Sequence, residues 1–493
     1  MKTSRFFSMR PIMNLLAHAF VAILVGAGGA GATPEPGSVP RPNVLLIMVD
    51  DLNTWTGPEE GHPQAHTPNL DRLAQRGVTF KRAYAAAPLC GPSRAAILYG
   101  LQPFVTGFYG HQAGHDPRGL IDASVVPLPL AFQQAGYATA GCGKIFHLGF
   151  EDDRGWDEFV RDVPSRESEG DDHDVIHEPF DFGPLDDVTD DDMNDMQLAN
   201  WAAERLRSPG DRPFFLAVGF RKPHLPWTVP RSYFDVHPRE KIHLPPSPED
   251  DLDDVPPIGR YLASPGVSFS APAGGDYRYI QQHDQWVDAV RAYLATCSFV
   301  DACVGRVMEA LDRSEARDNT IIILMGDHGW HLGEKQHWRK HALWEQATRT
   351  TLIVALPRSD RAGVRCDRVV SLIDTYATLS ELCGLTEKPD AGKSFVPLLR
   401  TPSRAWDYAA VSTFGPGNFS VRTESWSYLR YREGSEELYY HGDDPQEYRN
   451  LAGEPAFAEQ KAELASRLPE MWAADPAPDS KFNALRQFDR MSK

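Results

Sequence analysis

Three uninterrupted apolar runs stand out in the pattern of hydrophobic and polar positions along the chain. They cover residues 43–49, 213–220 and 320–325, and charged or polar residues follow each of them. A short continuous apolar run is typical of a strand that is buried on both faces of a parallel sheet. Segments with helical periodicity separate the runs, at residues 69–76, 128–135, 193–206 and 286–311. This alternation predicts an α/β fold with a mostly parallel central sheet that helices flank on both faces.

The pattern changes after about residue 401. Short apolar stretches at residues 409–414, 426–432 and 437–440 predict strands, and residues 455–472 predict a helix. We therefore expect a main domain at residues 42–401 and a smaller α+β C-terminal subdomain at residues 402–493. Within the main domain, residues 235–276 are rich in Pro, Asp and Gly, which predicts a long irregular segment.

The N-terminal 32 residues have the layout of a signal peptide. Basic residues come first, an apolar stretch follows at residues 12–25, and small residues occupy 26–32. The apolar stretch is shorter than the roughly 20 residues that span a bilayer, so we expect an exported protein without stable membrane insertion. An uncleaved N-terminal anchor is the alternative. Residues 33–41 predict an extended lead-in, and the location would be periplasmic or secreted, or lysosomal or extracellular in a eukaryote.

The formal net charge at pH 7 is −18, and it is concentrated in one region. Residues 151–195 contain 19 Asp or Glu residues against three Arg residues. Because binding to a phosphate backbone requires a basic surface, the composition argues against a nucleic-acid partner. We interpret the region as a solvated loop or insertion, with cation binding as the alternative.

Two pairs of residues at strand ends are candidates for a metal site. Asp50 and Asp51 follow the first apolar run, and Asp327 and His328 follow the third. Open α/β sheets place their ligands at the carboxyl ends of the strands. Three carboxylates and one imidazole form an oxygen-dominated set, which favours Ca²⁺ or Mg²⁺ over zinc. Each pair alone is also compatible with a helix cap or a turn.

The most informative string is Cys90-Gly91-Pro92-Ser93-Arg94. By itself it is also compatible with an ordinary thiol. The string resembles the signature of the sulfatase family, in which the cysteine is oxidised to Cα-formylglycine; only Tyr99, where the family usually has threonine, departs from it. The resemblance implies an alkaline-phosphatase-like fold, a formylglycine-generating maturation enzyme as partner, and a sulfated carbohydrate as substrate. It extends from about residue 42 to residue 472, so residues 42–401 would be the sulfatase catalytic domain.

The resemblance also implies a chemistry for position 90. A formylglycine hydrate carries two hydroxyls on one carbon, so one attacks sulfur and the other later loses its proton, which expels sulfate and restores the aldehyde. The implied metal ligands are Asp50, Asp51, Cys90, Asp327 and His328. Many sulfatases have asparagine at the last of these positions, and His328 instead resembles the iduronate-2-sulfatase branch of the family.

Further site residues follow from the same resemblance. Arg94 would hold the hydrate and the oxygens beside the metal, since its planar fork suits oxyanions. Lys144 would neutralise the sulfate and formylglycine oxygens, and His147 would accept the proton of the second hydroxyl. Their spacing of three residues again resembles the iduronate-2-sulfatase branch.

The leaving group would be served by residues from two other segments. His224, in the string that begins at Lys222, would donate a proton to the leaving alcohol, and Lys340 would contact the sulfate and the leaving oxygen. Trp330 and Lys335 are weaker candidates for substrate contacts. As isolated residues, each of these side chains is also compatible with a structural role or a solvated loop.

Two other classes of function remain open from the sequence. A phosphate-ester hydrolase of the same superfamily would use serine or threonine and usually two zinc ions, whereas Cys90 and one predicted metal favour sulfate. A non-catalytic glycan-binding relative is the second alternative. The implied substrate is a sulfated uronic acid or another unit of a sulfated polysaccharide, but the residues that recognise the sugar lie in loops that the motifs do not reach.

Six cysteines are scattered along the chain, at positions 90, 142, 297, 303, 366 and 383. Their number and spacing do not form a disulfide framework. If Cys90 is modified, five thiols remain, and Cys366 with Cys383 is the first pair to test. Buried free thiols are an equal alternative.

Overall fold

The computed structural model describes residues 41–111, 116–163, 181–263, 275–358, 362–387 and 391–476. The predicted signal peptide (1–32), residues 33–40 of the lead-in and part of the acidic region lie outside the described residues. Within the described part of the chain, no helix combines the length and the apolar character that a membrane span requires.

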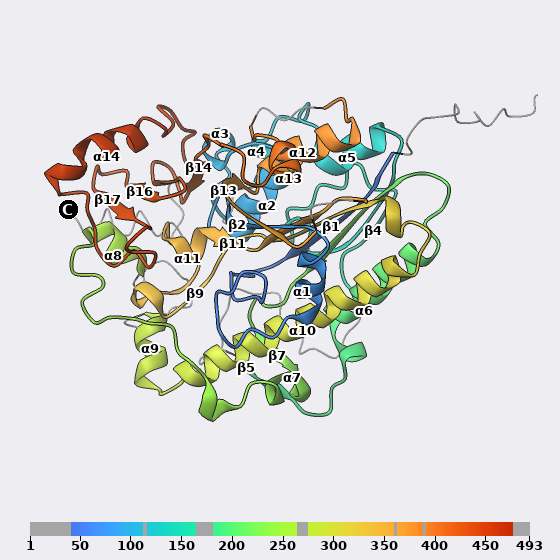
Figure 1. The fold of residues 1–493 in the computed structure, drawn as a ribbon, viewed down its shortest axis with the longest axis horizontal. Coiled ribbons are helices and arrows are strands. Elements are labelled where there is room, and N and C mark those ends of the chain that lie inside the picture. The colour runs from blue at the N-terminus through green and yellow to red at the C-terminus, as the bar shows by residue number, and fades with distance from the viewer. Residues whose placement is uncertain are drawn as a thin grey trace, which may run out of the picture. The chain divides into compact units, whose positions relative to one another are not determined.

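A nine-stranded sheet lies at the centre of the described chain (Figure 1). The strand order is β11-β2-β12-β8-β1-β6-β3-β4, and β13 also pairs with β2. The pairs from β8 to β4 and the pair β13–β2 are parallel, whereas β12 and β11 run antiparallel to their neighbours. The strands are β1 Asn43–Val49, β2 Val78–Tyr84, β3 Ala138–Gly143, β4 Glu158–Val160, β6 Phe214–Phe220, β8 Thr320–Gly326, β11 Arg349–Thr350, β12 Leu352–Ala355 and β13 Val364–Ser371.

This sheet confirms the predicted α/β fold with a mostly parallel centre. The three apolar runs become the adjacent strands β8, β1 and β6, and they end at the same level, because Val49 pairs with both Phe220 and Gly326. Full burial of all three strands explains why their sequences do not alternate.

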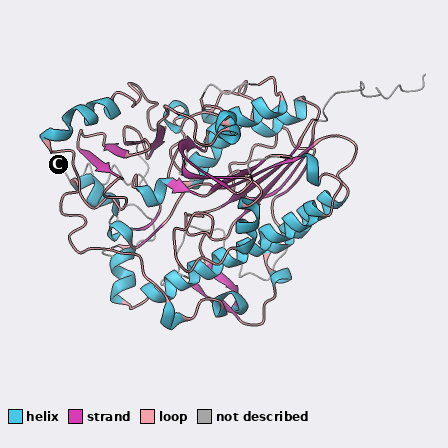
Figure 2. Cartoon of the chain, in the orientation of Figure 1, coloured by secondary structure: helices cyan, strands magenta, loops and turns pink. Residues whose placement is uncertain are grey.

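Helices cover both faces of the sheet (Figure 2). Successive side chains of a strand point to opposite faces, and alternate residues of β1 accordingly belong to two separate hydrophobic clusters. On one face the sheet packs against α1 Pro68–Ala74, α6 Asn194–Arg207 and α10 Trp286–Asp312. On the other it packs against α2 Cys90–Tyr99, α5 Leu128–Gln134, α12 Asp374–Cys383 and α13 Val396–Arg400. The four helices predicted from periodicity are therefore present, within two residues at each end.

Shorter elements connect these layers. They are α3 Pro103–Thr106, α4 Pro117–Leu120, β5 Phe182–Leu185, β7 Trp227–Pro230, α7 Arg231–Asp235, α8 Pro257–Ala263, α9 Asp276–Gln282, β9 His331–Leu332, β10 Trp338–Arg339 and α11 Glu345–Thr348, with 3₁₀ turns at Asp190–Asp192, Arg239–Lys241, Arg317–Asn319, Glu334–Gln336 and Pro455–Phe457. Helix α8 corrects the expectation that residues 235–276 are irregular throughout. Its Ile258 and Leu262 are buried against Trp344 and Tyr431, which are tertiary contacts that the local sequence does not announce.

The C-terminal region forms a four-stranded antiparallel sheet with one helix, which confirms the expected α+β subdomain. Its elements are β14 Ala410–Thr413, β15 Phe419–Arg422, β16 Trp426–Arg430, β17 Glu436–Tyr440 and α14 Ala458–Ala465. Strand β15 was not predicted. The helix expected at residues 455–472 is shorter in the structure, where α14 ends at Ala465. Pro469 explains the early end, because proline disfavours a helical conformation in the residue before it.

A buried ion network joins this sheet to the end of the main domain. The Arg422 guanidinium is fully buried and forms ion pairs with Glu447 and, at 3.3 Å, with Glu345. It also donates to the Leu343 carbonyl at 2.6 Å. Because breaking a buried ion pair is costly, this network fixes the segment that follows Lys340.

The six cysteines, all within the described residues, are buried free thiols. The disulfide considered between Cys366 and Cys383 is therefore absent. Cys366 lies on β13 with its sulfur 3.4 Å from the Pro402 carbonyl oxygen, whereas Cys383 ends α12.

Candidate functional site

The site lies at the carboxyl ends of four neighbouring parallel strands, β8, β1, β6 and β3. Sheet hydrogen bonding continues one residue past β1 and β8, since the Asp50 amide donates to Phe220 at 3.0 Å and the Asp327 amide donates to Val49 at 3.1 Å. The strand ends thus bring Asp50 next to Asp327, while Lys144 follows β3 directly. Asp50 and Asp327, which are 277 positions apart in the chain, become neighbours for this reason.

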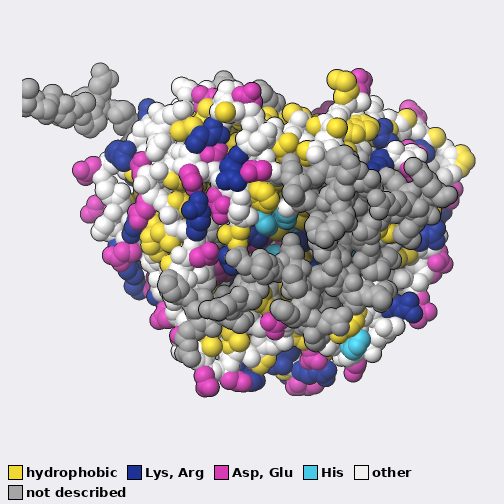
Figure 3. Space-filling view, turned by 180° about the vertical axis from the view of Figure 1, so that it is seen from behind, with side chains coloured by type: hydrophobic (Ala, Val, Ile, Leu, Met, Phe, Trp, Pro, Cys, Tyr) yellow, Lys and Arg dark blue, Asp and Glu magenta, His cyan; other side chains and the backbone are white. Residues whose placement is uncertain are grey.

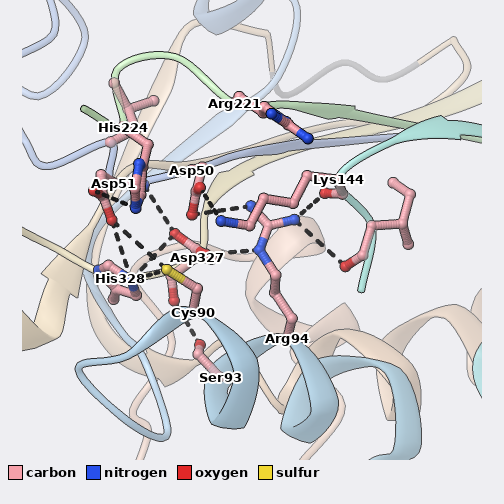
Figure 4. Close-up of polar contacts among 12 residues, drawn as sticks. Asp50, Asp51, Cys90, Ser93, Arg94, Lys144, Arg221, His224, Asp327 and His328 are labelled. Carbon is pink, nitrogen blue, oxygen red and sulfur yellow. Dashed lines mark hydrogen bonds and ion pairs between the residues drawn. The ribbon is translucent and has the colours of Figure 1, made fainter. Parts of the chain in front are cut away.

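Cys90 is the first residue of α2 and faces these strand ends (Figure 4). Its side chain is buried, with the sulfur 3.2 Å from His328 Nε2, 3.7 Å from Lys340 Nζ and 3.8 Å from Asp51 Oδ1. Burial and the neighbouring Asp50 carboxylate raise the pKa of the Cys90 thiol well above its ordinary value. The sulfur thus lies among the Lys340 amine, the His328 imidazole and the Asp51 carboxylate.

Asp51 holds an unusual backbone conformation. Its φ of 58° lies in the left-handed region, which a non-glycine residue seldom adopts. Hydrogen bonds from the Tyr293 hydroxyl to the Asp51 carbonyl (2.8 Å) and from the Asp51 amide to Asp327 Oδ1 (3.1 Å) hold it there. The turn leaves the Asp51 carboxylate facing Lys340 Nζ at 2.9 Å and 3.0 Å. Local backbone strain of this kind concentrates at functional sites.

Four side chains, including that of Cys90, form a cluster that could hold a metal ion. One ligand atom from each of Asp50, Cys90, Asp327 and His328 lies within 4.8 Å of the others, and all four residues are buried. Asp50 Oδ1 is buried without a hydrogen-bond partner, although Arg94 Nη2 forms an ion pair with it at 3.5 Å, so this oxygen still has a lone pair for a metal ion. His328 Nδ1 lies 2.9 Å from the Gly329 carbonyl oxygen, so Nδ1 carries the hydrogen and Nε2 is left as the ligand atom, as is usual for metal-binding histidines.

Arg94 braces the acidic cluster from below. Its Nε donates to Asp327 Oδ2 at 2.7 Å, its Nη1 donates to the Lys144 carbonyl, and its Nη2 lies 3.5 Å from Asp50 Oδ1 (Figure 4). The guanidinium is completely buried. The guanidinium therefore binds the strand ends and holds the carboxylates of Asp50 and Asp327 in place.

Lys144 and His147 follow β3 and take different positions. The Lys144 amine forms a buried ion pair with Asp50 Oδ2. Burial opposes the charge of Asp50, but Lys144 and other cations outweigh it and hold the pKa of that carboxyl well below its usual range. The His147 ring stacks on His111, with centroids 3.7 Å apart and planes 26° apart. Burial, His111 and Lys144 lower the pKa of His147 well below its ordinary value, which leaves the ring neutral.

His224 approaches the cluster from the loop after β6. Its Nε2 lies 3.8 Å from Asp51 Oδ2, and its Nδ1 lies 2.7 Å from the Leu225 carbonyl oxygen. The side chain is 23% exposed, so it stands at the border between the cluster and the solvent. Buried Asp195 holds the loop by accepting the amides of Arg221 (3.0 Å) and Lys222 (2.8 Å).

The predicted residues after β8 divide into two groups. Lys340 joins the site, and its amine lies 4.8 Å from the centre of the Trp330 ring. Trp330 is 1% exposed, so it supports Lys340 and does not offer its ring to solvent. Lys335 points elsewhere: its buried amine binds Asp251 at 2.8 Å and the Glu447 carbonyl. In the structure, neither Trp330 nor Lys335 presents its side chain to solvent, and the substrate contacts expected of them stay a prediction.

Sequence reasoning missed three residues that shape the site. Ser93 donates to the Asp327 carbonyl at 2.5 Å, Asp195 anchors the His224 loop, and His111 accepts a hydrogen bond from the Gly91 amide at 2.9 Å. Ser93 belongs to the recognised motif, and its side-chain role could have been suspected there. No motif surrounds His111, a single histidine after a glycine in a loop.

On one face of the molecule, histidine side chains are visible near the centre (Figure 3). Acidic and basic side chains are interspersed over that face, and the basic ones do not gather into one patch.

Comparisons with known proteins agree with this geometry. A family model described as "Sulfatase" matches residues 42–385, and one described as "N-sulphoglucosamine sulphohydrolase, C-terminal" matches residues 333–474. A sulfatase of Formosa agariphila is 37% identical, with 88% of this chain and 87% of that protein covered. Choline-sulfatase of Rhizobium meliloti is 30% identical (86% and 85% covered), and iduronate 2-sulfatase of Mus musculus is 29% identical (76% and 73% covered).

Solved structures show the same fold. A 2-O GAG sulfatase has a TM-score of 0.68 at 23% identity, covering 86% of this chain and 90% of its own. A phosphonate monoester hydrolase from Silicibacter pomeroyi has a TM-score of 0.71 at 21% identity, covering 86% and 94%. At this level of identity the likeness defines the fold alone, since one fold carries several chemistries.

The mostly parallel sheet flanked by helices, with the site at its strand ends, is an alkaline-phosphatase-like fold. The chain belongs to the sulfatase family and is a sulfuric ester hydrolase.

Proposed function

We propose that this enzyme removes sulfate from a sulfated carbohydrate, in the manner of iduronate 2-sulfatase, with a formylglycine made from Cys90 and one divalent cation. The observation that carries the proposal is the convergence of Asp50, Asp327 and His328 on the sulfur of Cys90. A formylglycine hydrate at this position would have ligands for a cation on one side and the amine of Lys340 on the other.

The residues that would hold the cation are Asp50, Asp51, Asp327 and His328, together with the side chain at position 90. Oxygen ligands predominate, which favours Ca²⁺ or Mg²⁺. When bound, the ion would neutralise negative charge on sulfate and lower the cost of ionising a hydroxyl at position 90.

The first half-reaction needs a proton at the leaving oxygen. One hydroxyl of the hydrate attacks sulfur, the bond between sulfur and the sugar oxygen breaks, and that oxygen takes a proton. His224 stands at the border of the cluster with Nε2 directed toward Asp51, and we assign the donation to it. Because Nδ1 donates to the Leu225 carbonyl, Nε2 carries a proton only in the imidazolium form. Burial lowers the pKa of His224, whereas the neighbouring Asp51 carboxylate favours that form. Lys340 assists: burial opposes its charge, but Asp51 outweighs this and raises the pKa of the amine, which therefore stays protonated.

The second half-reaction needs a base. The remaining hydroxyl loses its proton, the carbonyl forms, and the bond between carbon and the sulfate oxygen breaks, which releases sulfate and restores the aldehyde. We assign the proton to His147, because its Nδ1 lies 3.0 Å from the Leu148 carbonyl oxygen and Nε2 therefore keeps a free lone pair. Lys144 and Arg94 hold the charge of the acids around the reacting group.

The nature of the sugar follows from relatives and not from the site itself. Iduronate 2-sulfatase and a Δ4,5-hexuronate-2-O-sulfatase of Bacteroides thetaiotaomicron (27% identical) both act, by name, on a sulfated uronic acid. His328 and the three-residue spacing from Lys144 to His147 support the same branch. The proposal includes export through the signal peptide at residues 1–32 and a maturation enzyme that oxidises Cys90.

The active enzyme is expected to carry formylglycine at position 90. Peptide mass spectrometry should show that the Cys90 peptide has lost one sulfur and two hydrogens and gained one oxygen, whereas the peptides of the five other cysteines keep their thiols. The Cys90→Ser variant should stop after one turnover, because a serine sulfate has no second hydroxyl to expel the sulfate. Full activity from chains that retain only the thiol would disprove the modification.

One Ca²⁺ or Mg²⁺ per chain is expected, and Asp327→Ala should lose metal and activity together. Loss of the ion removes several kcal/mol of transition-state stabilisation, which corresponds to at least about 10²-fold in rate. Elemental analysis of the purified chain measures the metal. Asp153→Ala is the matched control, since that side chain is 81% exposed. Two zinc ions per chain would instead favour a phosphate-ester hydrolase.

A terminal 2-O-sulfated uronic acid is expected to be the preferred substrate by kcat/KM. The panel should compare it with N-acetylglucosamine 6-sulfate, choline sulfate and an aryl phosphate at matched concentrations. Preference for choline sulfate would contradict the carbohydrate assignment, since the relative from Rhizobium meliloti is as similar as the iduronate enzyme. Comparable rates on phosphate would contradict the preference for sulfate.

His224→Ala and His147→Ala should fail at different steps. A positioned acid is worth ~10²–10⁴ in rate, so His224→Ala should slow by that factor on a sugar sulfate and recover on an aryl sulfate, whose phenol leaves without help. His147→Ala should be slow on both substrates and accumulate the sulfate adduct at position 90 in a quenched reaction. Equal losses for His224→Ala on both substrates would show that the roles are misassigned.

A further inference from the structure

His111 links the backbone beside Cys90 to the ring of His147. Its Nε2 lies 2.9 Å from the amide nitrogen of Gly91, and its ring stacks on His147 with centroids 3.7 Å apart. Phe150 packs against both rings, at 6.1 Å from His111 and 5.8 Å from His147. The loop that carries His111 is itself anchored, since the Tyr109 hydroxyl donates to the Ala473 carbonyl at 2.7 Å.

The partners of the two rings determine which nitrogens carry hydrogen. A backbone amide can only donate, so Nε2 of His111 accepts from Gly91 and the neutral ring has its hydrogen on Nδ1. A carbonyl oxygen can only accept, so Nδ1 of His147 donates to Leu148 and its Nε2 keeps the lone pair. Nε2 of His111 is therefore already occupied by the Gly91 amide, whereas Nε2 of His147 can accept a proton.

Gly91 is the residue that admits His111. A Cβ added at position 91 would lie 2.5 Å from Nε2 and 2.6 Å from Cδ2 of the His111 ring, and 3.1 Å from Phe108. Contacts below 3.0 Å require something to move. A residue without a side chain at the variable position of the Cys-x-Pro-Ser-Arg string thus leaves room for the His111 ring.

We propose that His111 is a positioning residue for the hydrolysis: it holds the ring of His147 in the orientation in which Nε2 can take the proton from position 90, and Gly91 provides the room for it. This inference rests on the proposed function, which assigns that proton to His147. In this proposal His111 acts through His147 and does not contact the substrate.

The physical reason is the way in which the His147 ring is held. Its Nδ1 donates to the carbonyl of the next residue, Leu148, and Phe150 packs against the ring. The stack on His111 adds a parallel ring against one face of the imidazole and so fixes the plane of the His147 ring. A misplacement of about 1 Å at a reacting group can cost 10²-fold in rate, so loss of the stack should be visible in kcat.

The test uses three variants of the full-length, modified enzyme. His111→Ala removes the hydrogen bond from Gly91 and the stack on His147, His111→Phe keeps a ring that can stack on His147, and Gly91→Ala pushes the His111 ring away. The formylglycine content of each is measured by mass spectrometry, and kcat is given per modified chain. We expect kcat on an aryl sulfate to fall about 10-fold to 100-fold in His111→Ala and in Gly91→Ala, with KM within about twofold.

Two further readouts separate positioning from a general structural effect. The sulfate adduct at position 90 should accumulate in His111→Ala as in His147→Ala, and His111→Phe should recover much of the lost kcat. The double variant His111→Ala/His147→Ala should be no slower than His147→Ala alone, because His111 acts through His147. His283→Ala is the matched control: that ring also stacks on an aromatic side chain, Tyr279, at 3.9 Å and 25°, on an exposed helix end.

Unchanged kcat per modified chain in His111→Ala would overturn the inference. So would a rise in KM alone, which would make His111 a substrate contact, and so would additive losses in the double variant. These outcomes are distinguishable from failure of the proposed function, which would show in His147→Ala alone as wild-type turnover or as slow turnover without the adduct.

Discussion

The site depends on the meeting of three carboxylates with three buried cations at the ends of adjacent parallel strands. Asp50, Asp51 and Asp327 are completely buried, and each contacts Lys144, Lys340 or Arg94. An isolated buried charge is very costly, and removal of one partner from a buried pair costs about 3–5 kcal/mol. The acids therefore require the cations, and the cations come from three different parts of the chain.

This constraint explains why distant segments support the site. Lys340 lies in the segment that ends at Glu345, and Arg422 of the C-terminal sheet holds that segment through Leu343 and Glu345. Lys144 and Arg94 are joined in turn, since the Arg94 guanidinium binds the Lys144 carbonyl. The C-terminal sheet is thus connected to the site through the buried contacts of Arg422 and the short backbone segment between Lys340 and Glu345.

The sequence predicted the framework well where the physical signal is local. Burial on both faces produces long apolar runs, so strands β1, β6 and β8 could be located, and the carboxyl ends of parallel strands indicated where polar residues would gather. The short helix α8 and strand β15 were missed because tertiary packing stabilises them. Only the fold shows that the Lys335 amine pairs with Asp251, because these residues are far apart in the chain.

By itself, the sequence determined the fold class, the strand ends that carry Asp50 and Asp327, and the identity of Cys90 in its motif. These follow from local patterns that any fold must satisfy. Only the tertiary structure decided that His111 accepts a hydrogen bond from the Gly91 amide and stacks on His147. The same holds for the hydrogen bond from Arg94 to Asp327 and for the burial of Trp330 beneath the Lys340 amine. Such contacts join side chains of different elements and loops, and their geometry exists only once the fold has brought those segments together.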